Sequence, residues 1–515
     1  MRHGWTAWAR RLGVGMWMAL GAMLLSGCAS VEYRSPKLQA QTDGAVVIRV
    51  LPNVQSSSLY FKNWQALEIA RLPGLDDSHS DGKEKVYSIA PTTVGASRSA
   101  LYAGSLPPGH YRFVKFSAMQ CGAMCVQSWM GVNQKFSRFE VKAGQITDLG
   151  VLVQTAGEDS RSSLLTHAPK GGDALTPELV RELLPDIAPL LRQPTLGWRE
   201  ATVPPSMGSM QRLSITRSWG FASPHEDEAG SFLYGSANGV VGRWSPPWKR
   251  QSFDVGERVA IDAVLVTPAG DWIAGGEYSV VKLSKDRGAT WNNLRGQLPL
   301  GLVVDLTVWR DEVLLTMLKG GKDVQVYRAP AGTDQWKLAS SHPMDINWFF
   351  DVQGATPHSA LVSDTLVTTV PGRQLAVLDL PTGRDDLRKL PGAAQMFSAS
   401  ADGVLRCRCI STIKVDPYES RDLGQTWQES TASRFMLMPT FKDKSIGVAF
   451  KGGFFSPSKF TYTRDGGNTW TETTEAPVFF NQLFFSRDGR KAYAVSLQGI
   501  MWVTDDDGES WDRVQ

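Results

Sequence analysis

Four aspartates in the C-terminal half of the chain have hydroxyl side chains at the same positions on either side. Asp286, Asp422, Asp465 and Asp506 each follow a Ser or Thr by two residues and precede another by four. Carboxylates and hydroxyls at this spacing can accept backbone N–H groups and so brace a tight turn. The same carboxylates could instead bind calcium or act in catalysis, but such a site needs several oxygens that converge on one point. We favour the turn interpretation, because one aspartate per repeat spreads the carboxylates around a rim.

Each aspartate belongs to an eight-residue phrase, Ser/Thr-x-Asp-x-Gly-x-Thr/Ser-Trp. The glycine can adopt a positive φ, which a residue with a Cβ resists. The tryptophan can bury a large face, and its indole N–H can reach a carbonyl. The last three copies recur at roughly the period of a four-stranded propeller blade. The glycines and tryptophans concerned are Gly288, Trp291, Gly424, Trp427, Gly467, Trp470, Gly508 and Trp511.

Other reactive side chains give no comparable signal. The sequence has no Gly-x-Ser-x-Gly elbow, no His-Glu-x-x-His motif and no phosphate-binding loop, and its seven histidines are scattered. We therefore expect no metal and no cofactor, and we assign no catalytic residue. Cys121 and Cys125 flank a short loop, which favours a disulfide in an oxidising compartment. For Cys407 and Cys409, in a β-rich run, a bridge and free buried thiols both remain open.

The N-terminus has the features of a bacterial secretion signal in their usual order. A basic segment, residues 2–11, precedes an apolar stretch, residues 12–25, that is short for a membrane-spanning helix. The Leu-Ser-Gly-Cys sequence that ends at Cys28 resembles the lipobox of bacterial lipoproteins. That resemblance implies cleavage before Cys28 and acylation of its thiol and amine. With Ala29 rather than Asp in the next position, it also implies the outer membrane. The alternative is an ordinary signal peptide with a chance cysteine.

Charge excludes one class of partner. The chain has 54 Lys and Arg residues against 51 Asp and Glu residues. Removal of residues 1–27 would leave a net charge of about zero. A nucleic-acid-binding protein needs clustered basic residues, and none occur here. We therefore expect no nucleic-acid partner.

The N-terminal half of the mature chain predicts a small β domain. Residues 28–42 are polar and are expected to form a flexible tether. Short β-rich runs separated by Gly and Pro turns follow between residues 43 and 155. The Leu-Pro-Pro-Gly-His-Tyr sequence at 106–111 and the Val-Lys-Ala-Gly turn at 141–144 resemble the transthyretin-like, or carboxypeptidase-regulatory-like, β-sandwich. This resemblance implies an adhesive or spacing domain without catalytic residues.

Residues 156–211 are predicted to connect the two halves through a short helix. Thr176 is the expected N-cap, with Pro177 in the first turn. Leucines near one face make it a docking or linker helix, and Pro185 should end or kink it. An amphipathic membrane helix is the alternative, but few basic residues line its polar face.

The eight-residue phrase resembles the Asp-box, or bacterial neuraminidase repeat, of sialidases, sortilin-type receptors and a photosystem II assembly factor. The resemblance implies a turn between the third and fourth strands of a propeller blade. Residues 212–515 then hold about seven blades of roughly 43 residues, although six or eight also fit. Segments 331–336 and 380–384 look like worn copies of the phrase, and Trp248 marks a first blade without one. The predicted fold is all-β: a small N-terminal β-sandwich, a short helical connector and a seven-bladed Asp-box propeller.

The sialidase resemblance does not extend to catalytic residues. That family has a Phe/Tyr-Arg-Ile-Pro motif before its first box, and its arginine grips a sugar carboxylate. The nearest match here, Tyr327-Arg328-Ala329-Pro330, comes after the first clear box. No catalytic role is therefore transferred, and the chain is expected to be non-catalytic.

The sequence favours a lipid-anchored periplasmic scaffold or assembly factor of a Gram-negative bacterium, which binds an envelope protein through a propeller face. The alternative is a carbohydrate-active protein, either a sialidase-like glycoside hydrolase or a glycan-binding module. Adjacent aromatics such as Phe454 and Phe455, in a loop within a blade, would suit a protein or glycan surface.

Overall fold

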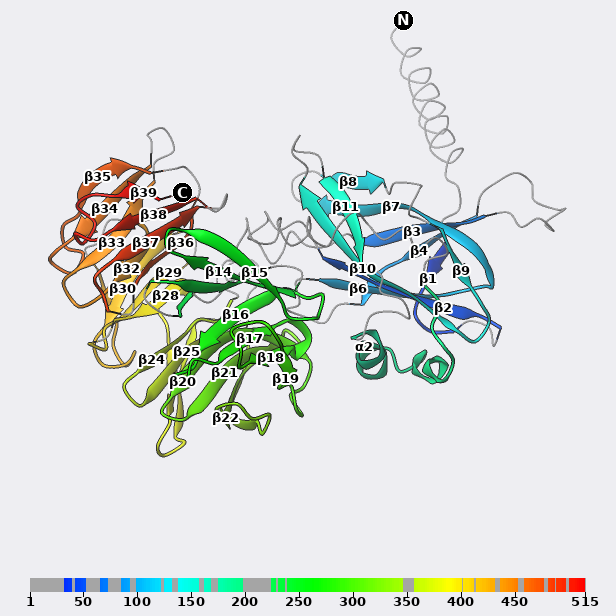
Figure 1. Cartoon of the computed structure of the whole chain (residues 1–515), viewed down its shortest axis with the longest axis horizontal. Coiled ribbons are helices and arrows are strands. Elements are labelled where there is room, and N and C mark those ends of the chain that lie inside the picture. The colour runs from blue at the N-terminus through cyan, green and yellow to red at the C-terminus, as the bar shows by residue number, and fades with distance from the viewer. Residues whose placement is uncertain are drawn as a thin grey trace, which may run out of the picture.

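The computed structural model is almost entirely β, as the sequence predicts (Figure 1). The residues that it describes are 32–38, 42–51, 65–72, 85–92, 99–121, 125–131, 138–156, 162–167, 175–197, 224–227, 230–236, 239–345, 356–400, 402–411, 414–430, 436–452, 458–476, 480–486, 488–496 and 500–514. The signal segment, Cys28 and the aromatic loop with Phe454 and Phe455 lie outside these ranges. None of the helices in the described part of the chain has the length and apolar character needed to cross a bilayer.

The N-terminal domain is a sandwich of two sheets. One sheet has the strand order β1-β4-β3-β7-β8, with β9 also paired to β7, and the other has the order β11-β10-β2-β6-β5. The strands are β1 (Glu32–Arg34), β2 (Gly44–Leu51), β3 (Ala66–Arg71), β4 (Val86–Ile89), β5 (Pro91–Thr92), β6 (Ala100–Leu106), β7 (Gly109–Cys121), β8 (Cys125–Gly131), β9 (Arg138–Val141), β10 (Ile146–Ala156) and β11 (Ser162–His167). The sheets therefore extend beyond residues 43–155 at both ends.

Strand β2 shows why its sequence lacks an apolar/polar alternation. Successive side chains of a strand point to opposite faces of its sheet. Val46 and Ile48 face the core between the two sheets, whereas Ala45 and Val47 belong to a second core outside the sandwich. Both faces of β2 are thus buried, which requires an almost continuous apolar run.

The polar segment at residues 28–42 differs from the expected tether. Residues Glu32–Arg34 form strand β1, which pairs in parallel with β4 at the edge of the six-stranded sheet. The Arg34 side chain is only 7% exposed, and its guanidinium lies 5.0 Å from the centre of the Tyr87 ring. Pairing with β4 and the buried Arg34 side chain hold this strand in place. It therefore needs no alternation of apolar and polar residues, which is the pattern that predicts a strand from sequence.

Helix α2 (Thr176–Leu183) and the 3₁₀ helix η2 (Ala188–Arg192) form the connector. Leu175, not Thr176, is the N-cap, and no side chain caps the helix. Thr176 is buried, and so the hydroxyl proposed as a cap lies inside the first turn. The helix ends before Pro185, as a proline requires. Leu179, Val180 and Leu184 are buried against the sandwich sheet, which makes α2 a docking helix.

The remaining described residues form seven four-stranded antiparallel sheets, each built from consecutive strands. We number these sheets as blades 1 to 7. Blade 1 comprises β12 (His225–Glu226), β13 (Phe232–Gly235), β14 (Val240–Ser245) and β15 (Lys249–Asp254), and blade 2 comprises β16 (Ile261–Val266), β17 (Trp272–Gly276), β18 (Val281–Ser284) and β19 (Asn292–Asn293). Blade 3 comprises β20 (Gly301–Trp309), β21 (Glu312–Lys319), β22 (Asp323–Pro330) and β23 (Lys337–Pro343), and blade 4 comprises β24 (Ser359–Val362), β25 (Thr365–Val370), β26 (Gln374–Asp379) and β27 (Asp385–Lys389).

Blades 5 to 7 follow the same scheme. Blade 5 comprises β28 (Ala393–Ala399), β29 (Leu405–Ile410), β30 (Val415–Ser420) and β31 (Gln428–Glu429). Blade 6 comprises β32 (Met436–Phe441), β33 (Gly447–Lys451), β34 (Lys459–Thr463) and β35 (Thr471–Glu475), and blade 7 comprises β36 (Phe480–Phe485), β37 (Ala492–Ser496), β38 (Met501–Thr504) and β39 (Asp512–Arg513). A further 3₁₀ turn, η4 (Glu277–Ser279), joins β17 to β18.

The blades form a ring around an axis. The first strands of neighbouring blades contact each other, as β16 contacts β20 and β24 contacts β28. The last blade meets the first through aromatic side chains: Phe232 lies 5.2 Å from Phe484 and 4.5 Å from Tyr493, between ring centroids. This arrangement confirms the predicted β-propeller architecture.

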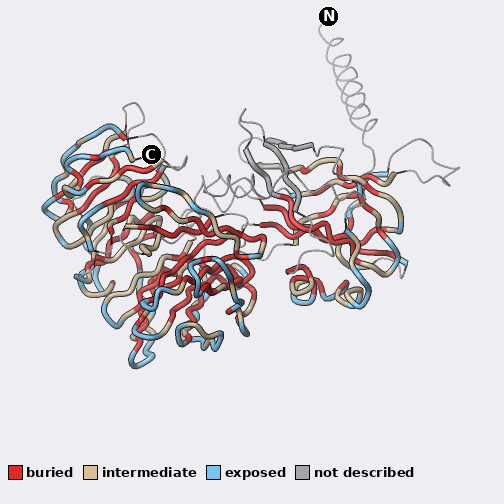
Figure 2. Tube along the Cα trace, viewed as in Figure 1, coloured by how far each residue is buried: buried red, intermediate tan, exposed pale blue. Residues whose placement is uncertain are grey.

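A single buried core joins the sandwich, α2 and the propeller. It includes Val47 and Leu101 from the sandwich, Leu179 from α2, and Val259 and Trp272 from blades 1 and 2. Figure 2 shows the buried segments of the five-stranded sheet next to those of the first blades. The sandwich is therefore not a separate spacer domain, because its outer face is buried against the propeller.

Candidate functional site

The box turn of blade 2 is a closed network of hydrogen bonds. The Ser284 hydroxyl donates to Asp286 Oδ1 (2.8 Å) and accepts the Gly288 N–H (2.6 Å). Asp286 also accepts the Thr290 N–H (2.8 Å) and the Thr290 hydroxyl (2.6 Å). The Trp291 indole N–H donates to the Gly288 carbonyl at 3.1 Å. Each carboxylate oxygen thus has a partner within the turn.

The three other boxes repeat the hydrogen bonds of the aspartate, and Trp470 also repeats the indole bond, to the Gly467 carbonyl at 3.0 Å. The carboxylates of Asp422, Asp465 and Asp506 accept from the backbone N–H and the hydroxyl of Thr426, Thr469 and Ser510 respectively. Hydrogen bonds to a carboxylate favour its charged form. The hydroxyl and backbone N–H of Thr290, Thr426 and Thr469 accordingly lower the pKa of Asp286, Asp422 and Asp465 to about 2. Each of these ionised carboxylates accepts hydrogen bonds from its own turn and thereby braces that turn.

The box glycines have two reasons to be glycine. Gly288, Gly424, Gly467 and Gly508 all have φ between +86° and +96°, a region that L side chains rarely adopt. A Cβ would also lie 2.5 Å from Phe253 at Gly288 and 2.5 Å from Leu375 at Gly424. The turn therefore presses its backbone against the preceding blade.

The box tryptophans stabilise contacts within and between blades. The Trp511 ring stacks on Phe460 of blade 6 with centroids 4.2 Å apart, and Trp470 meets Phe441 edge to face at 5.9 Å. Trp291 and Trp427 are partly buried at the margins of two apolar cores. All four boxes lie between the third and fourth strands of a blade.

The worn segments occupy the same place in blades 3 and 4. Residues 331–336 lie between β22 and β23, and residues 380–384 lie between β26 and β27. The Trp336 indole still donates to the Leu294 carbonyl of the previous blade, at 2.6 Å. In blade 4, Asp379 accepts the N–H and hydroxyl of Thr382.

A polar cleft of about 390 Å³ opens between the boxes of blades 5 and 6. Asp422 and Asp465 line it, together with Lys444 and Arg421. Both of these aspartates are occupied by their own turns, so the cleft wall is structural.

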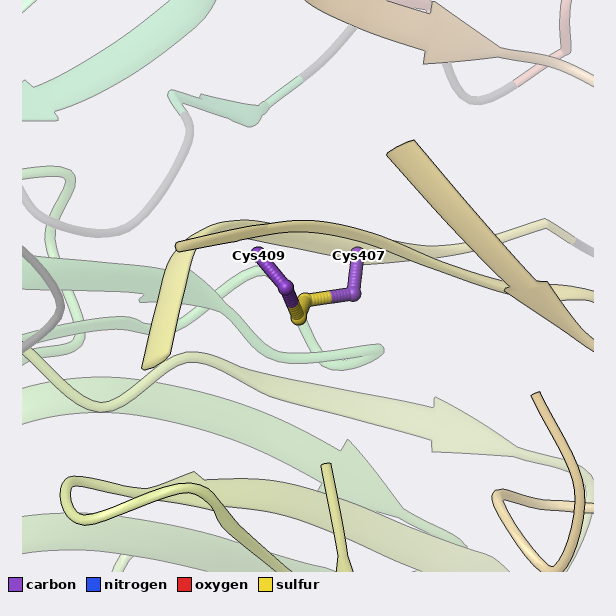
Figure 3. Close-up of a disulfide and its surroundings, with 2 residues drawn as sticks. All are labelled: Cys407 and Cys409. Atoms are coloured by element: carbon purple, nitrogen blue, oxygen red, sulfur yellow. A yellow bond between two sulfur atoms is a disulfide. The ribbon is translucent and has the colours of Figure 1, made fainter. Parts of the chain in front are cut away.

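The two cysteine pairs and Cys28 have different outcomes in the structure. Cys407 and Cys409, on the same face of β29, form a disulfide (Figure 3). Their Cα atoms are 5.5 Å apart, and both residues are buried against blade 4. The bridge answers the question that the spacing left open. Cys121 and Cys125 are Cα partners at the β7–β8 hairpin, and their side chains lie outside the described part of the structure. Cys28 lies outside it too.

The nearest match to a sialidase arginine is engaged in blade packing. Arg328 lies on β22, the third strand of its blade, and not on an axial strand. Its guanidinium pairs with Glu312 and donates to the Leu380 carbonyl of blade 4 at 3.1 Å. The neighbouring Tyr327 hydroxyl donates to Gln325 at 2.8 Å. This arginine joins two blades.

The axial strands carry two carboxylates that the sequence analysis did not single out. The first strands of blades 2, 3, 5, 6 and 7 each contain a bulge, a feature that re-aims side chains. Asp262 is the extra residue in β16, and Asp305 borders the bulge in β20. Asp305 retains some accessible surface, but desolvation by the surrounding protein raises its pKa to about 7. The sequence around Asp305 is that of an ordinary apolar strand, and it does not indicate that this aspartate lies near the propeller axis.

His358, just before β24, is the one axial histidine with a shifted pKa among the described residues. Burial lowers its pKa to about 4, so the imidazole is neutral near pH 7. In the described ranges, no group of three His, Cys, Asp or Glu side chains is placed to hold a metal ion.

The junction with the sandwich lies on the face opposite the boxes. Turns between second and third strands, and connections between blades, form this face, which we call the loop face. Buried Glu277, in η4 of blade 2, accepts the Ser99 N–H and hydroxyl from the sandwich. It also accepts the Ala260 N–H at 2.9 Å. The sandwich is thus joined to the loop face at blade 2.

Two arginines complete the junction. Buried Arg49 of β2 donates to the Arg258 carbonyl at 2.8 Å, and its guanidinium lies 5.7 Å from the Tyr278 ring centre. Arg295, in the connection from blade 2 to blade 3, pairs with Glu178 and Glu182 of α2. Tyr278 and Ser279 both have positive φ values, +55° and +57°, and so the η4 backbone is strained where it meets the sandwich.

Comparisons with known proteins identify no family. No protein-family model matches the sequence, and no curated protein matches it. Solved structures with a similar fold include "YCF48 bound to D1 peptide", at 11% identity and a TM-score of 0.44, over 56% of this chain and 93% of that one. YCF48 from Cyanidioschyzon merolae has 12% identity and a TM-score of 0.42, over 56% and 95%. BamB from Moraxella catarrhalis has 12% identity and a TM-score of 0.36, over 56% and 82%. At these values the likeness carries no functional inference.

Proposed function

We propose that the protein is a lipid-anchored periplasmic scaffold or assembly factor, which binds an envelope protein through the loop face of its propeller and catalyses no reaction. The lipobox that ends at Cys28 supports the anchor. The box carboxylates are occupied by their turns, which supports a structural role for the repeated phrase.

The observation that carries this proposal is the junction at Glu277. A buried carboxylate must be fully hydrogen-bonded to offset the cost of its desolvation. Here the partners come from two domains, Ser99 of the sandwich and Ala260 of the propeller, so the hydrogen bonds of the buried carboxylate are complete only while the domains are joined. A protein that fixes a sandwich on one sector of a propeller face presents a single composite surface.

The partner surface is the remaining sector of the loop face, over blades 3 to 5. Lys322, Asp345 and Lys414 are exposed there, at the turns and connections of successive blades. A rigid wheel whose loops converge on one face can present a broad recognition surface without reactive groups.

A site-specific photo-crosslinker tests the proposal. The crosslinking residue replaces Lys322 or Lys414 on the loop face, and replaces Lys285 or Arg490 on the box face as the matched control. We expect one dominant adduct with an envelope protein from the loop-face positions only. Equal adducts from both faces, or none from either in intact cells, would contradict the proposal.

The second candidate is a carbohydrate-active protein, and Asp305 is the observation that favours it. A carboxyl group with a pKa of about 7 on an axial strand has the property of a general acid in a glycosidase. A panel of fluorogenic glycosides, sialosides included, tests this function. Turnover that Asp305→Asn abolishes would establish the enzyme and displace the scaffold proposal.

A further inference from the structure

We propose that the β1–β4 edge of the sandwich lies against the lipid bilayer that holds Cys28. We define this edge by Glu32, Tyr33 and Lys85. The inference rests on the lipid anchor of the proposed function and adds an orientation to it.

The first argument is the length of chain between the anchor and the fold. Three residues, 29–31, separate Cys28 from Glu32. An extended chain spans at most about 3.3–3.6 Å per residue, so the two Cα atoms are no more than about 14 Å apart. The lipid headgroup region is itself roughly 5–8 Å deep on each side of the hydrocarbon core. The start of β1 must therefore lie in the headgroup region or within roughly 10 Å of it.

The second argument is that β1 is fixed to the domain. Its three residues pair in register with Tyr87, Ser88 and Ile89 of β4. Beyond the strand, the Ser35 carbonyl accepts the Ser105 N–H of the opposite sheet at 2.9 Å. A short anchor on a fixed strand holds the whole sandwich at the membrane, whereas the expected tether of some 14 residues would have let it move freely.

The third argument is the chemistry of the exposed edge. Tyr33 is 60% exposed and is the most exposed large hydrophobic side chain among the described residues. Tyrosine suits the membrane interface, because its ring is apolar and its hydroxyl is polar. The Lys85 side chain is 55% exposed. Lys85 pairs with Glu32 at 2.9 Å, and a lysine at an exposed edge can also bind lipid phosphates.

The edge also lies on the side of the sandwich away from the propeller. Strand β1 belongs to the six-stranded sheet, whereas the five-stranded sheet is the one buried against α2 and blades 1 and 2. In Figure 1, β1 lies in the part of the sandwich remote from the blades. Contact with the bilayer therefore leaves the loop face of blades 3 to 5 uncovered.

Lipid-quenching fluorescence tests the orientation. The full lipidated chain is prepared with Tyr33→Cys and labelled with an environment-sensitive dye. It is then placed on phosphatidylethanolamine–phosphatidylglycerol vesicles that contain a headgroup-nitroxide lipid. Leu338→Cys, on exposed β23 of blade 3, is the matched control, and the parent chain measures background labelling. We expect quenching at residue 33 at least threefold greater than at residue 338.

Two further variants separate the possible failures. A Gly/Ser insertion of about 15 residues after Ala29, which spans roughly 20 Å as a coil, should reduce quenching at residue 33. Cys28→Ser should abolish co-flotation with the vesicles. If Cys28→Ser still floats like the parent, the anchor is wrong and the proposed function loses its location. If the parent floats but residue 33 is quenched no more than residue 338, the anchor stands and the orientation is wrong. Dye–dye energy transfer that grows with protein density would instead assign the β1–β4 edge to a second copy of the chain, which also overturns the orientation.

Discussion

Each box turn depends on a hydroxyl that is buried beneath it. Thr463 is almost fully buried, accepts the Gly467 N–H at 2.9 Å and donates to Asp465 at 2.8 Å. A buried N–H without a partner is costly, since it loses water without gaining a substitute. The hydroxyl, more than the exposed aspartate, therefore connects the turn to the interior of the blade.

Thr463→Val removes this hydroxyl and keeps the shape of the side chain. We expect the free energy of unfolding to fall by about 1–3 kcal/mol, because the Gly467 N–H is left unsatisfied. Thr471→Val, at an exposed position of the outer strand β35, is the control and should change stability little. Urea unfolding measures both, and equal midpoints for the two variants would refute the role of the hydroxyl.

The box aspartates predict a loss of stability in acid. Asp286, Asp422 and Asp465 have pKa values of about 2 in the folded chain, against an ordinary value of 3.8. A carboxyl with a lowered pKa stabilises the fold above its unfolded pKa, and the contribution is lost as the pH falls through the folded pKa. The urea midpoint should therefore drop between about pH 4 and pH 2. The penalty for Asp422→Asn should shrink over the same interval, and a constant penalty would contradict the assignment.

Asp305 predicts the opposite dependence. Burial raises its pKa to about 7, so the unfolded chain releases its proton at lower pH than the folded chain does. Stability should fall as the pH rises from about 4 to 7, because the ionised carboxylate is disfavoured in the fold. Asp305→Asn should be more stable than the parent at pH 8, by on the order of 4 kcal/mol, and equal to it near pH 4. A stability difference that does not vary with pH would show that Asp305 is solvated.

At the scale of elements, the η4 turn bears the junction between domains. Glu277→Gln replaces one acceptor oxygen with an NH2 donor, which then faces either the Ser99 N–H or the Ala260 N–H. We expect a loss of about 1.5–3 kcal/mol and a separate, earlier unfolding of the sandwich. Glu257→Gln is the matched control, since Glu257 pairs with Lys282 at a partly buried site and should cost less than about 1 kcal/mol. Differential scanning calorimetry measures both, and a single unchanged transition in Glu277→Gln would show that Glu277 does not couple the domains.

The positions of the box turns can be predicted from local sequence, whereas those of some other elements depend on contacts between distant segments. Gly, Asp and Trp have conformational and hydrogen-bonding needs that are legible within eight residues, so even the worn turns near Trp336 and Thr382 lie between the expected strands. Strand β1 could not be predicted, because Glu-Tyr-Arg becomes a strand only through its pairing with β4. The Thr176 cap was wrong by one residue, since burial of Thr176 outweighs its value as a cap.

The domain junction, the axial aspartate and the disulfide could not be predicted from the sequence. Arg49 and Glu277 are charged residues, which are almost never fully buried unless they are paired, and their partners lie in other domains. The raised pKa of Asp305 likewise depends on strands brought together only by the ring. The Cys407–Cys409 bridge was open to either outcome, because the distance between two strand positions depends on local twist.

At the scale of the molecule, the described parts behave as one body with two ends of different character. One end is the β1–β4 edge of the sandwich, and the other is the ring with its boxes. The core that runs from β2 through α2 to blade 2 joins them. The position of the loop face relative to the β1–β4 edge is therefore set by packing.

The ring closes without a strand shared between its first and last described blades. Phe232 and Trp248 of blade 1 meet Tyr493 of blade 7 by side chains alone. Phe232 and Tyr493 lie some 260 positions apart along the chain, so closure must await synthesis of the final segment. Until then both ends of the arc display aromatic rings to solvent, and exposed apolar patches of this kind favour aggregation. Chains that stop before blade 7 would keep the apolar ends of the arc exposed.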